Sequence, residues 1–304
     1  MDNKLKAITA AWSASPTPLM EDLTVDTASV ERMVKHHIRL KQQGMFIGGT
    51  CGEGPYLPVS EFRKLVSSVS QAAGSDILVA VQVTDNSYSK VIDKINDAKA
   101  DGGDIAIIAE PWFCACMSEA ALLKYYLESA EKSRLPVGIY SRGAKEIPAK
   151  LYKQILAHPN VKIFKDSSLN DEIMNIALEA KQTRSDLFVM TGYELGMPKY
   201  LKAGYDGILA GGGILIGAVA NQMIEAAKAG EFDKLEGLQQ HCESIFYPAY
   251  GGRKITSWLT GLKYTLVKMG IFSTTAGYLK YDLTESVKAD IARMLEEEKD
   301  VLLP

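Results

Sequence analysis

The sequence contains few cysteines and no recognisable metal motif. Its 304 residues include four cysteines, and the two closest in sequence, Cys114 and Cys116, have one residue between them. This spacing gives neither a disulfide framework nor a CxxC pair, and no His/Cys cluster has the spacing of a zinc site. We therefore expect a cytoplasmic protein without a structural metal.

Long apolar runs and blocks of positive charge are also absent. The longest apolar stretches, such as 211–219, are far shorter than the roughly 20 residues that span a bilayer. The N-terminal segment lacks a positive region followed by a long apolar core, so no signal peptide is expected. The formal net charge is −3, and no run of lysine or arginine forms a patch. These absences argue against a membrane or a nucleic acid as the main partner.

Short β-rich runs alternate with longer amphipathic stretches along most of the chain. Because parallel strands need helical crossovers, this alternation indicates an α/β fold with a parallel sheet. Eight strands, buried on both faces, fit a closed (β/α)8 TIM barrel. The predicted strands are 5–10, 45–49, 77–81, 104–108, 136–140, 161–165, 187–191 and 207–209. The predicted helices between them are 30–43, 61–73, 91–100, 119–132, 149–158, 170–181 and 195–203.

The main alternative is a doubly wound open sheet. The first predicted strand, however, runs into the segment 12–18 without a GxGxxG fingerprint, which favours the barrel. Beyond about residue 217 the pattern becomes helical, with predicted helices at 217–228, 231–246, 254–269 and 285–299. We expect a barrel catalytic domain at 1–216 and a C-terminal helical region at 217–304 that includes the last barrel helix. Lys263, in that region, is expected to serve packing.

Lys165 ends the sixth predicted strand, where a barrel carries its catalytic groups. If Val161 and Ile163 point inward, Lys165 does too, and Phe164 faces the helices. Burial disfavours the ammonium form and lowers the pKa from about 10.4, and a neutral amine can attack a ketone to form an imine. The alternative is that Lys165 ends its strand in solvent and pairs with Asp166.

Two further features lie at the ends of the fifth and second predicted strands. Tyr140 has the same parity as Gly138, which leaves space inside the barrel, so its phenol could shuttle protons beside Lys165; alternatively it only covers the barrel top. The glycine-dense loop 48–54 allows close approach of a small ligand, and its N–H groups could bind a carboxylate. No GK[ST] follows this loop, so it is not a P-loop, and it could equally be a tight turn.

Together these elements resemble the dihydrodipicolinate synthase / N-acetylneuraminate lyase family of class I aldolases and dehydratases. The resemblance covers essentially the whole chain. Its segments are Ser15–Pro18 with Asp22 and Asp26, the loop Gly49–Glu53 (similar to G-[ST]-x-G-E), Tyr140, Lys165–Ser168, and the glycines Gly192, Gly204 and Gly207.

The resemblance implies a role for each matching residue. Lys165 would form an imine with the ketone carbon of a 2-oxo acid, and Tyr140 would relay protons. The implied substrate-binding positions are Thr50 and Cys51 for the 1-carboxylate, the Leu209 carbonyl, and Ser167. The resemblance implies no metal or organic cofactor, and it implies a homotetramer built as a dimer of dimers.

The chain departs from the family pattern at two points. Where the family commonly has P-x-Y-Y, with a tyrosine that crosses a subunit interface, the sequence reads Pro111-Trp112-Phe113-Cys114. Phe113 cannot pass a proton. After Tyr140 the usual N-x-P is missing, so a role for Arg142 in binding a distal carboxylate does not transfer. Both departures argue against dihydrodipicolinate synthase itself.

Glu194 bears on the substrate. The segment 192–194 is similar to the G-Y-D of sialate lyases, and the Glu194 carboxylate could accept hydrogen bonds from sugar hydroxyls. The alternative is that Glu194 only occupies the first turn of the next helix, where the helix dipole stabilises a carboxylate. We expect a 2-keto-3-deoxy sugar acid or related hydroxylated 2-oxo acid, cleaved to pyruvate and an aldehyde. The alternatives are dehydration through the same imine and, because of Phe113, a non-catalytic keto-acid sensor.

Overall fold

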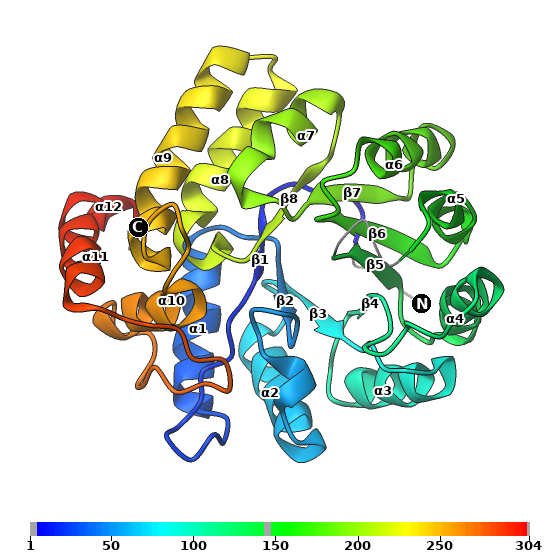
Figure 1. Ribbon diagram of the computed structural model, residues 1–304, viewed down its shortest axis with the longest axis horizontal. Helices are drawn as coiled ribbons and strands as arrows, with labels where there is room; N and C mark the ends of the chain where they lie inside the picture. The colour runs from blue at the N-terminus through cyan, green and yellow to red at the C-terminus, as the bar shows by residue number, and fades with distance from the viewer. Residues whose placement is uncertain (1–4, 143–146, 303–304) are drawn as a thin grey trace.

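Eight parallel strands form a closed barrel in chain order. The computed structural model describes residues 5–142 and 147–302. The strands lie at the centre of Figure 1, ringed by helices, as the (β/α)8 prediction requires. They are β1 (Trp12–Ala14), β2 (Gly44–Ile47), β3 (Leu78–Gln82), β4 (Ile105–Ile108), β5 (Val137–Ser141), β6 (Val161–Asp166), β7 (Phe188–Thr191) and β8 (Gly207–Ala210).

Helices α1–α8 alternate with the strands, and further helices follow them. The barrel helices are α1 (Thr27–Arg39), α2 (Val59–Ala73), α3 (Tyr88–Ala100), α4 (Glu119–Lys132), α5 (Ala149–Ala157), α6 (Asp171–Thr183), α7 (Met197–Ala203) and α8 (Gly213–Lys228), with 3-10 turns η1 (Gly54–Tyr56) and η2 (Glu194–Gly196). The C-terminal helices are α9 (Phe232–Tyr250), α10 (Trp258–Lys268), α11 (Glu285–Glu297) and α12 (Lys299–Leu302). Helix α9 packs on α8, and α10 and α11 pack on α9, to one side of the barrel (Figure 1).

Side-chain caps explain where several helices begin. The Asp26 carboxylate accepts the N–H of Ser29 at 3.1 Å, so α1 starts three residues before the predicted helix at 30–43. Ser118 caps α4 in the same way, accepting the N–H of Ala121 at 3.2 Å. Because a capping oxygen satisfies an N–H that has no partner within the helix, it fixes the start of the helix. Apolar periodicity alone does not contain that information.

The first predicted strand, 5–10, is wrong. The segment is irregular, and β1 begins at Trp12. The side chain of Gln43 takes the place of a neighbouring strand: its oxygen accepts the N–H of Thr9 at 3.0 Å, and its nitrogen donates to the Ala7 carbonyl at 2.6 Å. Ile8 packs into the barrel interior. Its apolar character therefore reflects burial, not strand pairing.

The strands are buried on both faces and separate two apolar clusters. The cluster inside the barrel includes Trp12, Phe46 and Ile107. The larger cluster lies between the sheet and the helices and includes Val81 and Phe164. The outward direction predicted for Phe164 is therefore confirmed. This arrangement explains why the strands are continuous apolar runs.

A register shift between β5 and β6 corrects one predicted side-chain direction. Val137 pairs with Val161, but Gly138 pairs with Ile163, so Lys162 is an extra residue on β6. Val161 consequently packs in the outer cluster, whereas Ile163 packs inside the barrel. The inward direction predicted for Val161 is wrong, and that predicted for Ile163 is confirmed.

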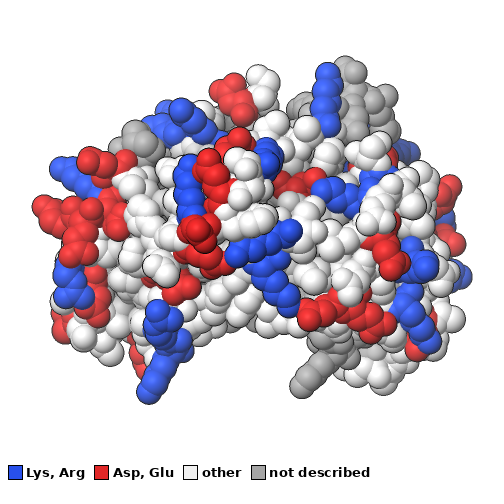
Figure 2. Space-filling view, turned by 90° about the horizontal axis from the view of Figure 1, so that it is seen from above, with Lys and Arg blue, Asp and Glu red and all other residues white. Residues whose placement is uncertain are grey.

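The surface carries both signs of charge. On the face shown in Figure 2, lysine and arginine side chains alternate with aspartate and glutamate, without a single-sign patch covering that face. Within 5–142 and 147–302, no helix has the length and apolar character needed to cross a membrane.

Candidate active site

The amino group of Lys165 lies in the mouth of the barrel. The residue is 4% exposed. Its Nζ lies 4.2 Å from the centroid of the Tyr140 ring and 5.0 Å from that of Phe46. Burial lowers the pKa of Lys165 to about 8, although the nearby Cys51 and Glu194 act in the opposite direction. An amine with such a pKa is still mostly protonated at pH 7, but its neutral fraction, about one tenth, is more than a hundredfold that of an ordinary lysine.

Asp166 does not pair with Lys165. Its buried carboxylate accepts the hydroxyl of Tyr205 at 2.7 Å and the N–H of Ser168 at 2.8 Å. Successive strand residues point to opposite faces, so Asp166 faces away from the barrel interior. No salt bridge involves Lys165 in the part of the chain that the structure describes. The alternative in which Lys165 ends in solvent beside Asp166 is therefore wrong.

Tyr140 lies next to Lys165 and is 8% exposed. Burial raises the pKa of Tyr140 to about 12, and the nearby hydroxyl groups of Thr50 and Ser167 oppose this rise only in part. The phenol is therefore protonated at neutral pH. It lies between Thr50, in the glycine-dense loop after β2, and Ser167, which follows Lys165.

Gly192, directly after β7, leaves the space that Lys165 occupies. A Cβ built there would lie 2.3 Å from Ser167 Oγ and 2.7 Å from Lys165 Cε. At Gly138 a Cβ would lie 2.3 Å from Cδ1 of Ile107. The space predicted at Gly138 is therefore filled by a side chain of β4, whereas the lack of a side chain at Gly192 leaves room for Lys165.

The loop after β2 is tightly held. Thr17 donates its hydroxyl to the Gly52 carbonyl at 2.6 Å, and Gly48 has a φ of +65°, which favours glycine. Thr50 is exposed, whereas Cys51 is buried and burial raises the pKa of its thiol to about 12. The loop thus offers its backbone and the Thr50 hydroxyl, with a neutral thiol underneath.

Glu53, at the end of this loop, forms a buried ion pair that sequence reasoning missed. Its carboxylate accepts Nζ of Lys263 at 2.5 Å and the N–H groups of Tyr278 and Leu279 at 2.6 and 2.8 Å. Lys263 also donates to the Ala276 carbonyl at 2.7 Å. The packing role expected of Lys263 is therefore incomplete, because its charge joins α10 to the candidate ligand loop.

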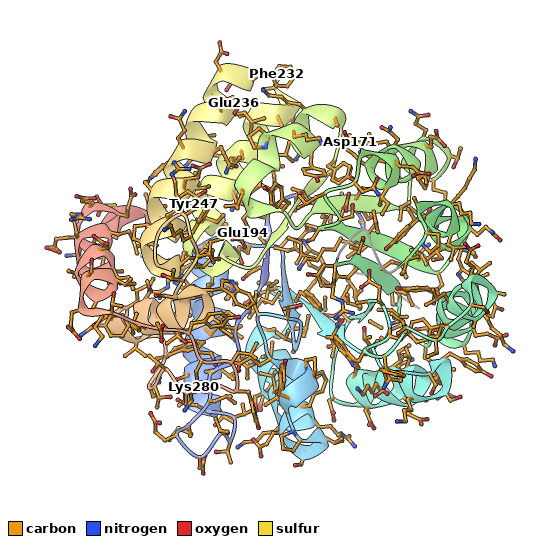
Figure 3. The ribbon with its side chains drawn as sticks, viewed as in Figure 1. Asp171, Glu194, Phe232, Glu236, Tyr247 and Lys280 are labelled. Carbon is orange, nitrogen blue, oxygen red and sulfur yellow. The ribbon has the colours of Figure 1, made fainter. Side chains whose placement is uncertain are left out.

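Glu194 lies at the other side of the mouth, in η2. Its carboxylate accepts the N–H of Gly212 at 2.5 Å and the hydroxyl of Tyr250 at 2.9 Å. Burial raises the pKa of the Glu194 carboxyl, and these two hydrogen bonds oppose that effect. Gly212 caps α8, so the carboxylate meets the N-terminus of α8 and not that of α7. Figure 3 shows Glu194 nearer to the barrel centre than Phe232, at the far end of α9.

Arg142 is held by a buried carboxylate. Its Nε lies 2.9 Å from Oε2 of Glu110, which is fully buried, and its guanidinium lies 4.6 Å from the centroid of the Trp112 ring. Burial raises the pKa of Glu110, and Arg142 opposes this rise. Arg142 therefore stands at the end of β5 with its charge balanced.

The remaining predicted positions are found as follows. Leu209 is fully buried inside the barrel. It is the second-last residue of β8 and pairs with Trp12 of β1, so its carbonyl lies near the end of β8. Phe113 is 69% exposed. The structure thus brings Thr50, Cys51, Tyr140, Lys165, Ser167 and Glu194 to one end of the barrel. The described residues contain no group of His, Cys, Asp and Glu side chains that could hold a metal ion.

Known proteins are similar to this chain over nearly its full length. Residues 7–296 match the model of the dihydrodipicolinate synthetase family. The 4-hydroxy-tetrahydrodipicolinate synthase of Chlorobium limicola is 22% identical over 273 residues, which cover 88% of this chain and 89% of that protein. The dihydrodipicolinate synthase structure from Bacteroides thetaiotaomicron has a TM-score of 0.86 at 22% identity, covering 96% and 100% of the two chains. The enzyme from Acinetobacter baumannii, complexed with pyruvate, has a TM-score of 0.80 at 19% identity, covering 96% and 99%.

Proposed function

The chain belongs to the dihydrodipicolinate synthetase family, and we propose that it is a Schiff-base lyase that cleaves a hydroxylated 2-oxo acid to pyruvate and an aldehyde. One observation carries the proposal: Lys165 holds a buried amino group of lowered pKa, about 8, beside the phenol of Tyr140. A desolvated amine is a competent nucleophile toward a ketone. The pyruvate bound in the Acinetobacter baumannii relative agrees with this ligand class.

The proposed sequence begins with binding of the substrate carboxylate by Thr50 and the backbone of Cys51. Lys165 Nζ then attacks the C2 carbonyl carbon, and Tyr140 relays a proton to the oxygen, which leaves as water. The protonated imine accepts the electron pair of the C3–C4 bond as that bond breaks. The C4 hydroxyl gives up its proton, so the C4 fragment leaves as an aldehyde. Protonation of the enamine at C3 and hydrolysis of the imine release pyruvate and restore the amine.

Two contacts favour a hydroxylated tail over a second carboxylate. Glu194 presents a carboxylate, held by Tyr250, which can accept hydrogen bonds from hydroxyls. Arg142 is already paired with the buried Glu110, so its charge is balanced before any substrate arrives. Together with the absence of a hydroxyl at Phe113, this disfavours the dihydrodipicolinate synthase reaction for this chain.

A dehydratase that uses the same imine is the second candidate. Burial raises the pKa of Glu194, so its carboxyl group retains a proton more readily and could donate it to a leaving hydroxide. A dehydratase would lose water and keep all carbon atoms, whereas the lyase releases pyruvate. The products therefore separate the two candidates.

The decisive experiment is trapping with pyruvate and borohydride, followed by peptide mass spectrometry. We expect the reduced adduct on Lys165 alone. Lys165→Ala should abolish the adduct and turnover while the protein stays folded. Lys162→Ala is the matched control, because Lys162 lies on the same strand but pairs with Asp186 outside the barrel. Wild-type protein without an adduct would leave the keto-acid sensor as the better explanation.

We also propose a homotetramer. Phe113, which the family resemblance assigns to a subunit interface, is 69% exposed in the single chain, as a residue that a partner subunit covers would be. Sedimentation velocity at micromolar concentration measures the assembly. A monomer under those conditions would contradict the proposal.

A further inference from the structure

Gln82, the last residue of β3, carries a side-chain amide without a partner. The residue is 4% exposed, and both Oε1 and Nε2 are buried. Neither atom has a hydrogen-bond partner among the residues that the structure describes. An unpaired polar group in a protein interior is destabilising, and native proteins keep few of them without a functional reason. The Gln82 amide is therefore a candidate for hydrogen bonding to a ligand.

The side chain of Gln82 points into the barrel. Along β3, Val79 and Val81 pack in the outer cluster, whereas Ala80 packs in the interior cluster. Side chains of a strand alternate between its two faces, so Gln82 shares the interior face with Ala80.

The strand register puts Gln82 at the height of Tyr140. Gln82 pairs with Ile107, and Ile107 pairs with Gly138. The strands of an eight-stranded barrel tilt relative to its axis. From one strand to the next, the residue at the same height along the axis therefore lies about one residue beyond the hydrogen-bonded partner. Two strands from Gln82, the residue at the same height is Tyr140, two residues past Gly138.

This height lies directly above Lys165. Interior layers of such a barrel come from alternate strands. Lys165 and Phe46 share the layer of even-numbered strands, in agreement with the 5.0 Å between Nζ of Lys165 and the Phe46 ring. Gln82 and Tyr140 belong to the layer of odd-numbered strands on the mouth side. An acid bound to Lys165 would thus extend its carbon chain into the layer that contains Gln82.

We propose that Gln82 determines specificity by hydrogen bonding a hydroxyl of the 2-oxo acid on Lys165. The inference rests on the proposed function and names the substrate group. An amide carries donors and an acceptor, and a hydroxyl can pair with both. A carboxylate only accepts, so it would leave Oε1 of Gln82 unpaired. Gln82 ends β3 and Glu194 follows β7, on opposite sides of the barrel, so they contact different hydroxyls.

The test compares wild type with Gln82→Leu, which keeps the size but removes the amide. For each variant, the half-saturating concentration for borohydride trapping is measured with pyruvate and with a 2-keto-3-deoxy hexonic acid. We expect the value for the hexonic acid to rise about tenfold or more, as for a lost buried hydrogen bond, and that for pyruvate to stay within about twofold. The melting temperature should not fall, because no folded-state hydrogen bond is removed.

Gln82→Met is the second variant, in case the branched side chain disturbs packing. Equal changes for both acids, or a change for neither, would overturn the assignment of Gln82. The assignment would also be overturned if the wild-type protein traps pyruvate but its half-saturating concentration for the hexonic acid is no lower than that of Gln82→Leu. Failure of the Schiff-base chemistry on which the inference rests is distinguishable, because it shows as absent pyruvate trapping on wild-type Lys165.

Discussion

Nζ of Lys263 lies 2.5 Å from Oε1 of Glu53, and both residues are almost fully buried. The pair connects α10, near the end of the chain, to the loop that follows β2. Desolvation lowers the pKa of Lys263, and the charge of Glu53 opposes this. The conformation of the candidate carboxylate loop therefore depends on a helix outside the barrel.

Lys263→Met tests that dependence. Removing one partner leaves the Glu53 carboxylate buried without a counter-charge, which costs about 3–5 kcal/mol of unfolding free energy. Lys268→Met is the control, since Lys268 is an exposed lysine on the same helix, and it should change stability by about 0.5 kcal/mol or less. Urea denaturation measures both. A loss below about 1 kcal/mol for Lys263→Met would contradict the structural importance of the pair.

The rate of imine formation should report the titration of Lys165. Only the neutral amine attacks the ketone, and the pKa of Lys165 is lowered to about 8 from the usual 10.5. The rate should therefore rise about tenfold per pH unit at acidic pH and level off above about pH 8. The measurement is the initial rate of pyruvate trapping from pH 6 to 10. A midpoint near the pKa of an ordinary lysine would show that the amine is not desolvated.

Gly192→Ala should strongly lower the activity of the site without unfolding the protein. The added carbon meets Ser167 Oγ at 2.3 Å and Lys165 Cε at 2.7 Å, so the amine must move. A displacement on the order of 1 Å can lower catalysis by about 10²-fold. Gly237→Ala, in α9, is the control because nothing lies within 4 Å of the added carbon. That control should retain activity and gain about 0.5–1 kcal/mol of stability. Trapping rates near wild type for Gly192→Ala would be the contrary result.

Thiol labelling should separate the cysteines by burial. Cys116 is exposed, whereas Cys51 is buried with a pKa raised to about 12. Because the thiolate is the reactive form, Ellman's reagent should label Cys116 quickly and Cys51 only after denaturation. Rapid labelling of Cys51 in the native protein, followed by peptide mapping, would contradict its position beneath the loop. The variant Cys116→Ser removes the fast reaction, and peptide mapping then separates Cys51 from Cys114 and Cys242.

Some of the misplaced features come from contacts that local patterns do not contain. Residues 5–10 have the apolar character of a strand, but the Gln43 side chain takes the backbone hydrogen bonds that a strand would make. The inward direction of Val161 followed from simple alternation, which the extra residue Lys162 interrupts. Tyr250 and Lys263 reach Glu194 and Glu53 from helices far along the chain. Single-sequence reasoning had no means of pairing them.

The sequence by itself determined the barrel and the residues at its mouth, because both depend on short-range order. Alternating β-rich and amphipathic runs require parallel strands with helical crossovers, and strand parity directs Tyr140 and Lys165 inward. Only the tertiary structure decided what surrounds those residues. The pKa of Lys165, the orphaned amide of Gln82 and the ion pair of Glu53 with Lys263 arise from burial and from proximity across distant segments. Desolvation and close packing are properties of the folded chain, and no stretch of sequence contains them alone.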